Sequence, residues 1–182
     1  MIIDCHTHLN RYSPEEPERL ADRCALLRAA LEANGISRAL VLGSYAVNAE
    51  RPSTRELLEQ LRGDPRFGVV GGIRAGRPRE AELAELRELL QTGHLRGLKL
   101  YPGYEPYSAA DPELHAFYAL AREFRVPVMV HSGDTYARGA RVRFAHPLTV
   151  DDAAVAFPDV TFVLCHLAVS YTHLTLPTTS RV

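Results

Sequence analysis

Lysine is almost absent from this 182-residue chain. Of its 21 lysine and arginine residues, Lys99 is the one lysine and the other 20 are arginines. A bias this strong is typical of drift in base composition, so it draws attention to the position that kept lysine. A lysine ammonium is compact, can lose its proton when buried and can be carboxylated, whereas arginine stays charged and planar. Lys99 is therefore a candidate functional residue, although one lysine could also survive by chance.

The sequence also lacks the segments that mark membrane and nucleic-acid-binding proteins. No apolar run approaches the roughly 20 residues of a membrane span, and Met-Ile-Ile-Asp begins a strand rather than a secretory signal. The net charge is −1 and no segment is strongly basic, so nothing favours nucleic acid or an anionic membrane. We expect a cytoplasmic protein that acts on a small molecule and that can form a homo-oligomer.

Cysteines and glycine-rich motifs are scarce as well. The three cysteines, Cys5, Cys24 and Cys165, are an odd number without the spacing of a metal or redox motif. Reduced thiols are the simplest interpretation, and we expect Cys5 and Cys165 to be small, buried packing residues. No G-x-G-x-x-G follows the first strand and no G-x-x-x-x-G-K occurs, which weighs against a nucleotide-binding sheet.

The sequence does contain an alternation of strands and helices. Strands are predicted at residues 2–6, 37–42, 67–73, 95–100, 126–131 and 160–166. Helices are predicted at 15–34, 50–62, 79–91, 111–124 and 149–157, with Asp111 and Thr149 as caps. Strands separated by helices predict a parallel sheet. Because a whole barrel needs about 250 residues, the fold class predicted is α/β, a partial (β/α)8 TIM barrel with about six of eight strands.

Chemically active side chains stand at the ends of four of these strands. His6 and His8 end the first, Lys99 the fourth, His131 the fifth and His166 the sixth. The C-terminal strand ends of a TIM barrel build its active site, so we expect these residues to face one mouth. Imidazoles suit zinc and related divalent metals. The alternative is a set of hydrogen-bonded core histidines, because an unpartnered buried imidazole would be costly.

Asp4 is a supporting candidate beside this set. In a regular strand it would share the face of His6 and His8, because side chains alternate between the two faces. We interpret it as a hydrogen-bonding group in the core or behind the metal ligands, with no specific role as the alternative.

Several segments carry a family resemblance. They are Ile3-Asp-Cys-His-Thr-His-Leu9, Arg96-Gly-Leu-Lys-Leu-Tyr-Pro102, Val126-Pro-Val-Met-Val-His-Ser-Gly133, His146-Pro-Leu148, Asp151-Asp152 and Phe157-Pro-Asp-Val-Thr-Phe-Val-Leu-Cys-His-Leu167. Through them the chain resembles the amidohydrolase superfamily, in the branch known as amidohydrolase family 2. The resemblance covers residues 1 to about 168, and its motifs are specific jointly, through their order and spacing.

The resemblance implies a role for each residue at a matching position. His6, His8 and His131 would bind a divalent metal, and His166 would bind a second metal or act on the water or substrate. Lys99 would be a carboxylated bridging ligand, as in some relatives, or a substrate contact, as in others. The family's aspartate at the end of strand eight lies beyond the matching region, so no residue here is given its role.

The reaction implied is metal-dependent hydrolysis. Three neutral imidazoles leave a coordination position for water, and zinc can lower the pKa of that water to about 7. The hydroxide would attack a C–N or C–O bond of a small amide, lactone or ester, while His166 polarises the carbonyl or relays a proton. Zinc is the expected metal, with Mn²⁺ or another divalent ion as the alternative, and no other cofactor is expected.

Other functions remain open at this point. Some relatives, such as aminocarboxymuconate-semialdehyde decarboxylase, use the same constellation for non-hydrolytic decarboxylation, and Lys99 could then hold a substrate carboxylate. A hypothesis of another class is a catalytically inert fragment. TatD-like nucleases carry a glutamate at the position of Lys99, and histidinol-phosphatase-like phosphoesterases would show more metal ligands by this point, which disfavours both.

The composition changes abruptly after Ala168. Four of the ten threonines fall in residues 169–182, and alanine is missing from that segment. Residues 169–179 resemble one reading frame of a transposon-end sequencing adapter. We therefore expect a metagenomic fragment with one barrel domain at residues 1–168 and a non-native tail at 169–182, in which His173 has no role. The alternative is a genuine polar tail.

Overall fold

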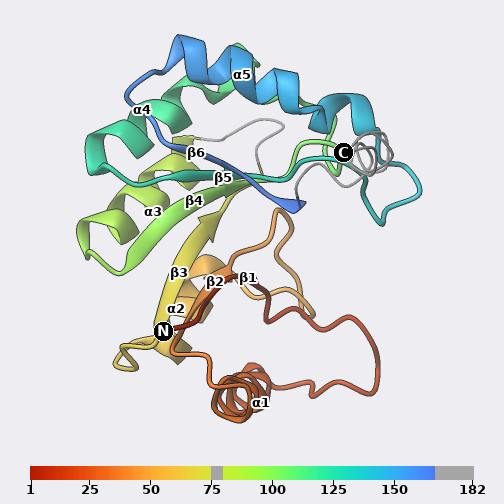
Figure 1. Cartoon of the computed structure of the whole chain (residues 1–182), viewed down its shortest axis with the longest axis vertical. Coiled ribbons are helices and arrows are strands. Elements are labelled where there is room, and N and C mark those ends of the chain that lie inside the picture. Colours follow the sequence, from red (N-terminus) through yellow and green to blue (C-terminus); the bar gives the residue numbers. More distant parts are fainter. Residues whose placement is uncertain (75–79, 167–182) are drawn as a thin grey trace, which may run out of the picture. The chain divides into compact units, whose positions relative to one another are not determined.

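The computed structural model describes residues 1–74 and 80–166. Its strands are β1 (Ile3–Thr7), β2 (Arg38–Leu42), β3 (Phe67–Gly72), β4 (Leu95–Leu100), β5 (Val128–Val130) and β6 (Phe162–Leu164). Its α-helices are α1 (Leu20–Ala33), α2 (Thr54–Leu61), α3 (Glu80–Gln91), α4 (His115–Phe124) and α5 (Pro147–Ala156). Strands and helices alternate along the chain, as the sequence predicts (Figure 1).

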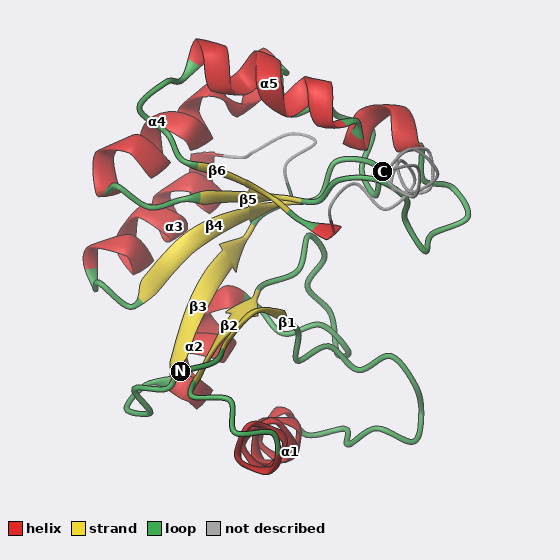
Figure 2. Ribbon diagram, in the orientation of Figure 1, coloured by secondary structure: helices red, strands yellow, loops and turns green. Residues whose placement is uncertain are grey.

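The strands are ordered β1-β2-β3-β4-β5-β6 in the sheet, which is their order in the chain (Figure 2). The neighbouring pairs β1–β2, β2–β3, β3–β4 and β5–β6 are parallel. These observations confirm the predicted fold class, an α/β fold with six strands of a partial TIM barrel. Contacts divide the chain into two compact units: residues 1–74 with 84–99, and the remaining described residues.

The core of the first unit lies between its strands and helices. Val41 of β2 and Val70 of β3 have no exposed surface, and Leu57 of α2 is 1% exposed. Burying a side chain of this kind stabilises the fold by about 1.5–3 kcal/mol. Three helices begin several residues later than predicted. In α1 the start moves to Leu20, and in α2 it moves to Thr54, where the Ser53 hydroxyl accepts the N–H of the third helical residue.

In α4 the start moves to His115. Asp111 lies before a 3-10 turn (Pro112–Leu114) and its side chain makes no capping hydrogen bond, so the prediction of Asp111 as the cap of this helix is wrong.

The second unit packs α4 and α5 with β5 and β6. The Tyr118 ring of α4 lies edge-on to Phe157 and Phe162, 5.1 and 5.2 Å between ring centroids. The predicted cap of the last helix, Thr149, is wrong. The cap of α5 is His146, whose Nδ1 accepts the N–H of Leu148. Pro147 suits the first helical position because that position needs no N–H donor.

The first strand departs from strict alternation. Asp4 pairs with Ala39 and Thr7 pairs with Val41, so β1 advances three residues while β2 advances two. Such a bulge breaks the alternation that would place Asp4 on the face of His6 and His8. Cys5 is exposed, so the expectation that it is a buried packing residue is wrong, while Cys165 is buried as expected.

The described part of the chain contains no helix that is both long and apolar enough to cross a membrane. The domain boundary predicted at residue 168 and the tail at 169–182, including His173, lie outside the described residues.

Candidate metal and substrate site

His6 and His8 lie side by side at the end of β1. Their Nε2 atoms are 3.2 Å apart, and both side chains are partly buried. Two nitrogen ligands of one tetrahedral zinc ion, each about 2.0–2.1 Å from the metal, are themselves about 3.3–3.4 Å apart. The spacing of this pair therefore fits a shared metal ion. It also fits a hydrogen bond from one ring to the other in the metal-free protein.

The main chain of β2 determines the tautomer of His8. Its Nδ1 lies 3.1 Å from the carbonyl oxygen of Leu42. A carbonyl only accepts, so Nδ1 carries the hydrogen and Nε2 of the neutral ring carries the lone pair. A ligating histidine that donates its other ring N–H to a carbonyl is a common arrangement at metal sites. His8 thus presents toward His6 the nitrogen that could bind a metal.

Asp4 supports this pair through the backbone. Its Oδ1 accepts the N–H of His6 at 2.9 Å, which spans the bulge in β1. Asp4 therefore makes a hydrogen bond, but to the main chain of His6 and not to an imidazole ring, and a place behind metal ligands stays a prediction.

A cavity lies beside His8. Its volume is about 320 Å³, and its walls come from the loop after β1, including Asn10 and Tyr12, and from α1, including Leu26 and Leu27. Cavities of about 300 Å³ and more are the size that small ligands occupy.

Lys99 is fully buried near the end of β4. Its side chain has no exposed surface, and its register partner in β3 is Gly72. A buried ammonium requires compensation by polar or charged groups. The burial agrees with a specific role for the one lysine, and the predicted orientation of its side chain into the barrel mouth stays a prediction.

His131 is held at the end of β5 in the second unit. It is 4% exposed, and its Nε2 lies 3.0 Å from the carbonyl oxygen of Asp134. By the reasoning used for His8, Nε2 carries the hydrogen and Nδ1 carries the lone pair of the neutral ring. His131 would thus bind a metal through Nδ1, whereas His8 would bind through Nε2.

His166 meets His131 at the same end of the neighbouring strand. Their ring centroids are 4.9 Å apart and the ring planes are inclined by 63°. Two hydrogen bonds join the strands beside them: the Ser132 hydroxyl donates to the Cys165 carbonyl, and the Cys165 N–H donates to Val130. His166 has φ +62°, a left-handed conformation that non-glycine residues rarely adopt. Such strain clusters at functional sites.

The structure thus brings the histidines together as two pairs, one in each unit. Residues 1–74 and 80–166 contain no group of three or more histidine, cysteine, aspartate or glutamate side chains that could hold a metal ion. The shared site of His6, His8 and His131 stays a prediction, and so do the roles of His166 and Lys99.

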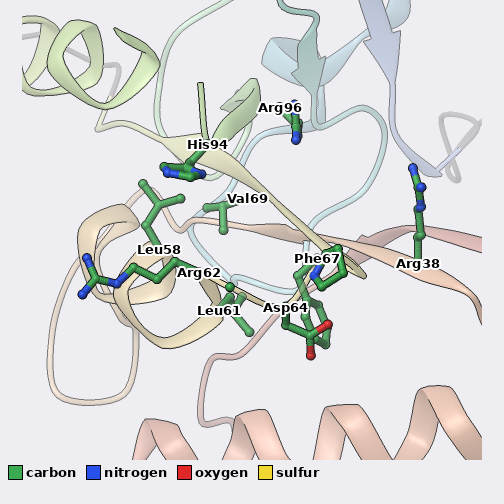
Figure 3. Close-up of a pocket in the computed structure, with 11 residues that line it drawn as sticks. Arg38, Leu58, Leu61, Arg62, Asp64, Phe67, Val69, His94 and Arg96 are labelled. Atoms are coloured by element: carbon green, nitrogen blue, oxygen red, sulfur yellow. The ribbon is translucent and has the colours of Figure 1, made fainter. Parts of the chain in front are cut away.

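A second cavity, of about 370 Å³, lies at the opposite ends of the strands in the first unit (Figure 3). It is lined by residues at the starts of the strands, Arg38, Phe67 and Arg96 among them, and by the end of α2. None of the predicted site residues lines it. Figure 3 shows the Arg62 side chain directed away from Asp64. This cavity is not a part of the candidate site.

Sequence reasoning missed the groups that orient the histidines. The carbonyls of Leu42 and Asp134 are main-chain atoms, so no side chain marks them. Tyr104, whose ring lies edge-on to His131, comes from a loop between β4 and α4. Ser132 directly follows His131, which is the one signal that could have drawn attention to it.

Comparison with known proteins decides the family. The model of the amidohydrolase family matches residues 3–180. This chain belongs to amidohydrolase family 2. The matched range includes the strand-end histidines and Lys99, and it extends past residue 168. No curated protein matches the sequence.

Solved structures with the same fold have different activities. An uncharacterized TIM-barrel protein from Bordetella bronchiseptica is 22% identical, with a TM-score of 0.72 over 97% of this chain and 72% of its own. The 5-carboxyvanillate decarboxylase of Sphingomonas paucimobilis is 16% identical, with a TM-score of 0.62 over 97% and 70%. A Pseudomonas putida protein described as a 2-pyrone-4,6-dicarboxylic acid hydrolase is 19% identical, with a TM-score of 0.55 over 91% and 57%. The chain spans 57–72% of the length of these structures.

Proposed function

We propose that this amidohydrolase is a metal-dependent hydrolase of a C–N or C–O bond in a small amide, lactone or ester. The metal would be held by His6, His8 and His131, with zinc as the expected ion. The observation that carries the proposal is the His6–His8 pair, with its Nε2 atoms 3.2 Å apart and the His8 tautomer set by the Leu42 carbonyl. The cavity beside His8 supports a small-molecule substrate.

Each residue then has a defined task. A divalent ion at this site would supply Lewis acidity, which makes water a stronger acid and a carbonyl a better electrophile. His8 and His131 would bind through the nitrogens that their carbonyl partners leave without a hydrogen. His166 would relay a proton or polarise the substrate carbonyl, and its ring contact with His131 supports a place beside the ligands. Lys99 would hold an anionic group of the substrate or serve as a carboxylated ligand.

A second candidate reaction is non-hydrolytic decarboxylation. The similarity in fold to a 5-carboxyvanillate decarboxylase favours it, and a buried lysine suits a substrate that carries a carboxylate. The two reactions differ in their products. Hydrolysis incorporates one oxygen atom from ¹⁸O-labelled water, whereas decarboxylation releases CO₂ without that incorporation.

Zinc binding tests the proposal. Titration of the metal-free 182-residue chain with zinc, followed by calorimetry, is expected to give one ion per chain. His6→Gln, His8→Gln and His131→Gln should each weaken binding at least tenfold, because each removes one of three ligands. His94→Gln changes an exposed histidine at the other end of β4 and is the matched control. Absence of zinc binding, or equal affinity in all four variants, would contradict the proposal.

A further inference from the structure

Tyr104 lies against the ring of His131. The two ring centroids are 4.9 Å apart and the ring planes are inclined by 66°. His166 contacts the His131 ring at the same centroid distance. Edge-to-face packing is a favoured arrangement of aromatic rings. The imidazole is therefore held by two rings and by its hydrogen bond to Asp134.

The loop that carries Tyr104 is held by hydrogen bonds within it. The buried Tyr107 hydroxyl accepts the N–H of Tyr101 at 2.6 Å. Burial raises the pKa of the Tyr107 hydroxyl well above its usual value, so it stays neutral. The Glu105 N–H donates to the Tyr101 carbonyl, and the Glu105 carbonyl accepts the N–H of Gly103. Tyr104 thus sits in the middle of a hydrogen-bonded turn.

The same loop is joined to the loop that follows β5. The N–H of Arg141 donates to the carbonyl of Gly103 at 3.1 Å. The Tyr104 hydroxyl accepts the N–H of Tyr136 at 3.4 Å, a long contact. The backbone beside Tyr104 is therefore held by a neighbouring segment of the second unit, whereas its hydroxyl makes only a long contact.

We propose that Tyr104 is a positioning residue for His131. Its ring limits rotation of the imidazole, so that Nε2 stays on the Asp134 carbonyl and Nδ1 is presented as the ligating nitrogen. The aromatic ring, and not the hydroxyl, performs this task, because the hydroxyl contact is long whereas the ring contact is close. The consequence for metal binding rests on the proposed function, and the consequence for the tautomer of His131 does not.

The test combines a tautomer measurement with a zinc titration. Long-range ¹H–¹⁵N spectra of the metal-free 182-residue chain at pH 8 report which nitrogen of each histidine carries the hydrogen, and His131→Gln assigns the signal. Wild type and Tyr104→Phe should show His131 with hydrogen on Nε2, and their zinc affinities should agree within about twofold. Tyr104→Leu should show a mixture of tautomers and an affinity about tenfold weaker, the range found when an outer partner of a metal ligand is lost.

The controls separate positioning from general damage. His8 should keep its Nδ1–H tautomer in Tyr104→Leu, and Tyr136→Leu, at a fully exposed position, should leave both readouts unchanged. Should Tyr104→Leu fail to fold by circular dichroism, Tyr104→Met takes its place. The proposal is overturned if Tyr104→Leu keeps His131 in the Nε2–H tautomer. It is also overturned if Tyr104→Phe alters the tautomer of His131 as much as Tyr104→Leu does. If wild type binds no zinc, the proposed function fails while the tautomer result still decides the role of Tyr104.

Discussion

The residues of the candidate site are oriented by main-chain carbonyls. His8 donates from Nδ1 to Leu42, and His131 donates from Nε2 to Asp134. The two rings therefore present different nitrogens, although both follow strands. Which nitrogen a histidine offers depends on the acceptor that the fold places beside it, so the strand pattern alone cannot determine it.

Among the described residues, Lys99 is the most deeply buried charged side chain. Replacing Lys99 with Arg is expected to lower the free energy of unfolding by about 1–3 kcal/mol, because a larger group must enter a fully packed position. If Lys99 contacts the substrate as proposed, the same change should also reduce turnover. Urea unfolding of the 182-residue chain measures the stability.

Arg96→Lys is the matched control for Lys99→Arg. Arg96 is exposed on the same strand, so this exchange should change the stability by less than about 0.5 kcal/mol. Equal stabilities of Lys99→Arg and wild type, together with normal turnover, would show that lysine survived at this position by chance.

Among the elements, the loop between β4 and α4 depends most on one glycine. Gly103 has φ +92°, and a Cβ at this position would lie 3.1 Å from Cβ of Ala145 and 3.2 Å from Cγ2 of Thr135. Its backbone conformation and its close neighbours both disfavour a side chain. The loop can therefore approach the segment after β5 closely enough to hold Tyr104 beside His131.

Gly103→Ala is expected to destabilise the protein by about 1–3 kcal/mol, since alanine at positive φ costs more than the entropy it saves. Gly139→Ala serves as the control, because Gly139 has no neighbouring atom within 4 Å of an added Cβ. Thermal unfolding of the two variants should differ by several degrees. Identical melting temperatures would contradict the packing seen around Gly103.

At the scale of the whole molecule, the dependence of stability on acid pH includes a contribution from the carboxylate of Asp64. Asp64 accepts hydrogen bonds from Arg66 at 2.9 Å and from Arg28 of α1 at 3.2 Å. These guanidinium groups, that of Arg66 first, lower the pKa of Asp64 from 3.8 to about 2. Because the folded pKa is the lower one, the stabilisation is present above about pH 4 and is lost as the pH falls through 2.

Asp64→Asn should therefore lower the free energy of unfolding at pH 7 by about 1–2 kcal/mol, less than the full pKa shift implies, because solvent screens partly exposed pairs. At pH 2 the variant and wild type should be nearly equal in stability. Asp22→Asn removes an exposed pair with Arg19 at 4.0 Å and should change little at any pH. Urea unfolding between pH 2 and 7 measures these differences, and a constant gap between Asp64→Asn and wild type would refute the assignment.

The fold class and the position of nearly every strand could be predicted from the amino-acid sequence alone. Apolar segments and helical periodicity are local signals, and β4 runs from Leu95 to Leu100 as predicted. Helix starts were less predictable. His146 displaced Thr149 as the cap of α5 because the chain direction before Pro147 decides which side chain can reach the first N–H groups.

The side chains at the strand ends were also visible in the sequence, through their order and spacing: His6, His8, Lys99, His131 and His166. How these side chains are held depends on the tertiary structure. Four features join residues distant in the chain or depend on strand pairing: the bulge after Asp4, the burial of Lys99, the Tyr104 contact with His131 and the Leu42 carbonyl beside His8. Such contacts arise from the register of strands and the packing of loops, and neither leaves a local pattern in the sequence.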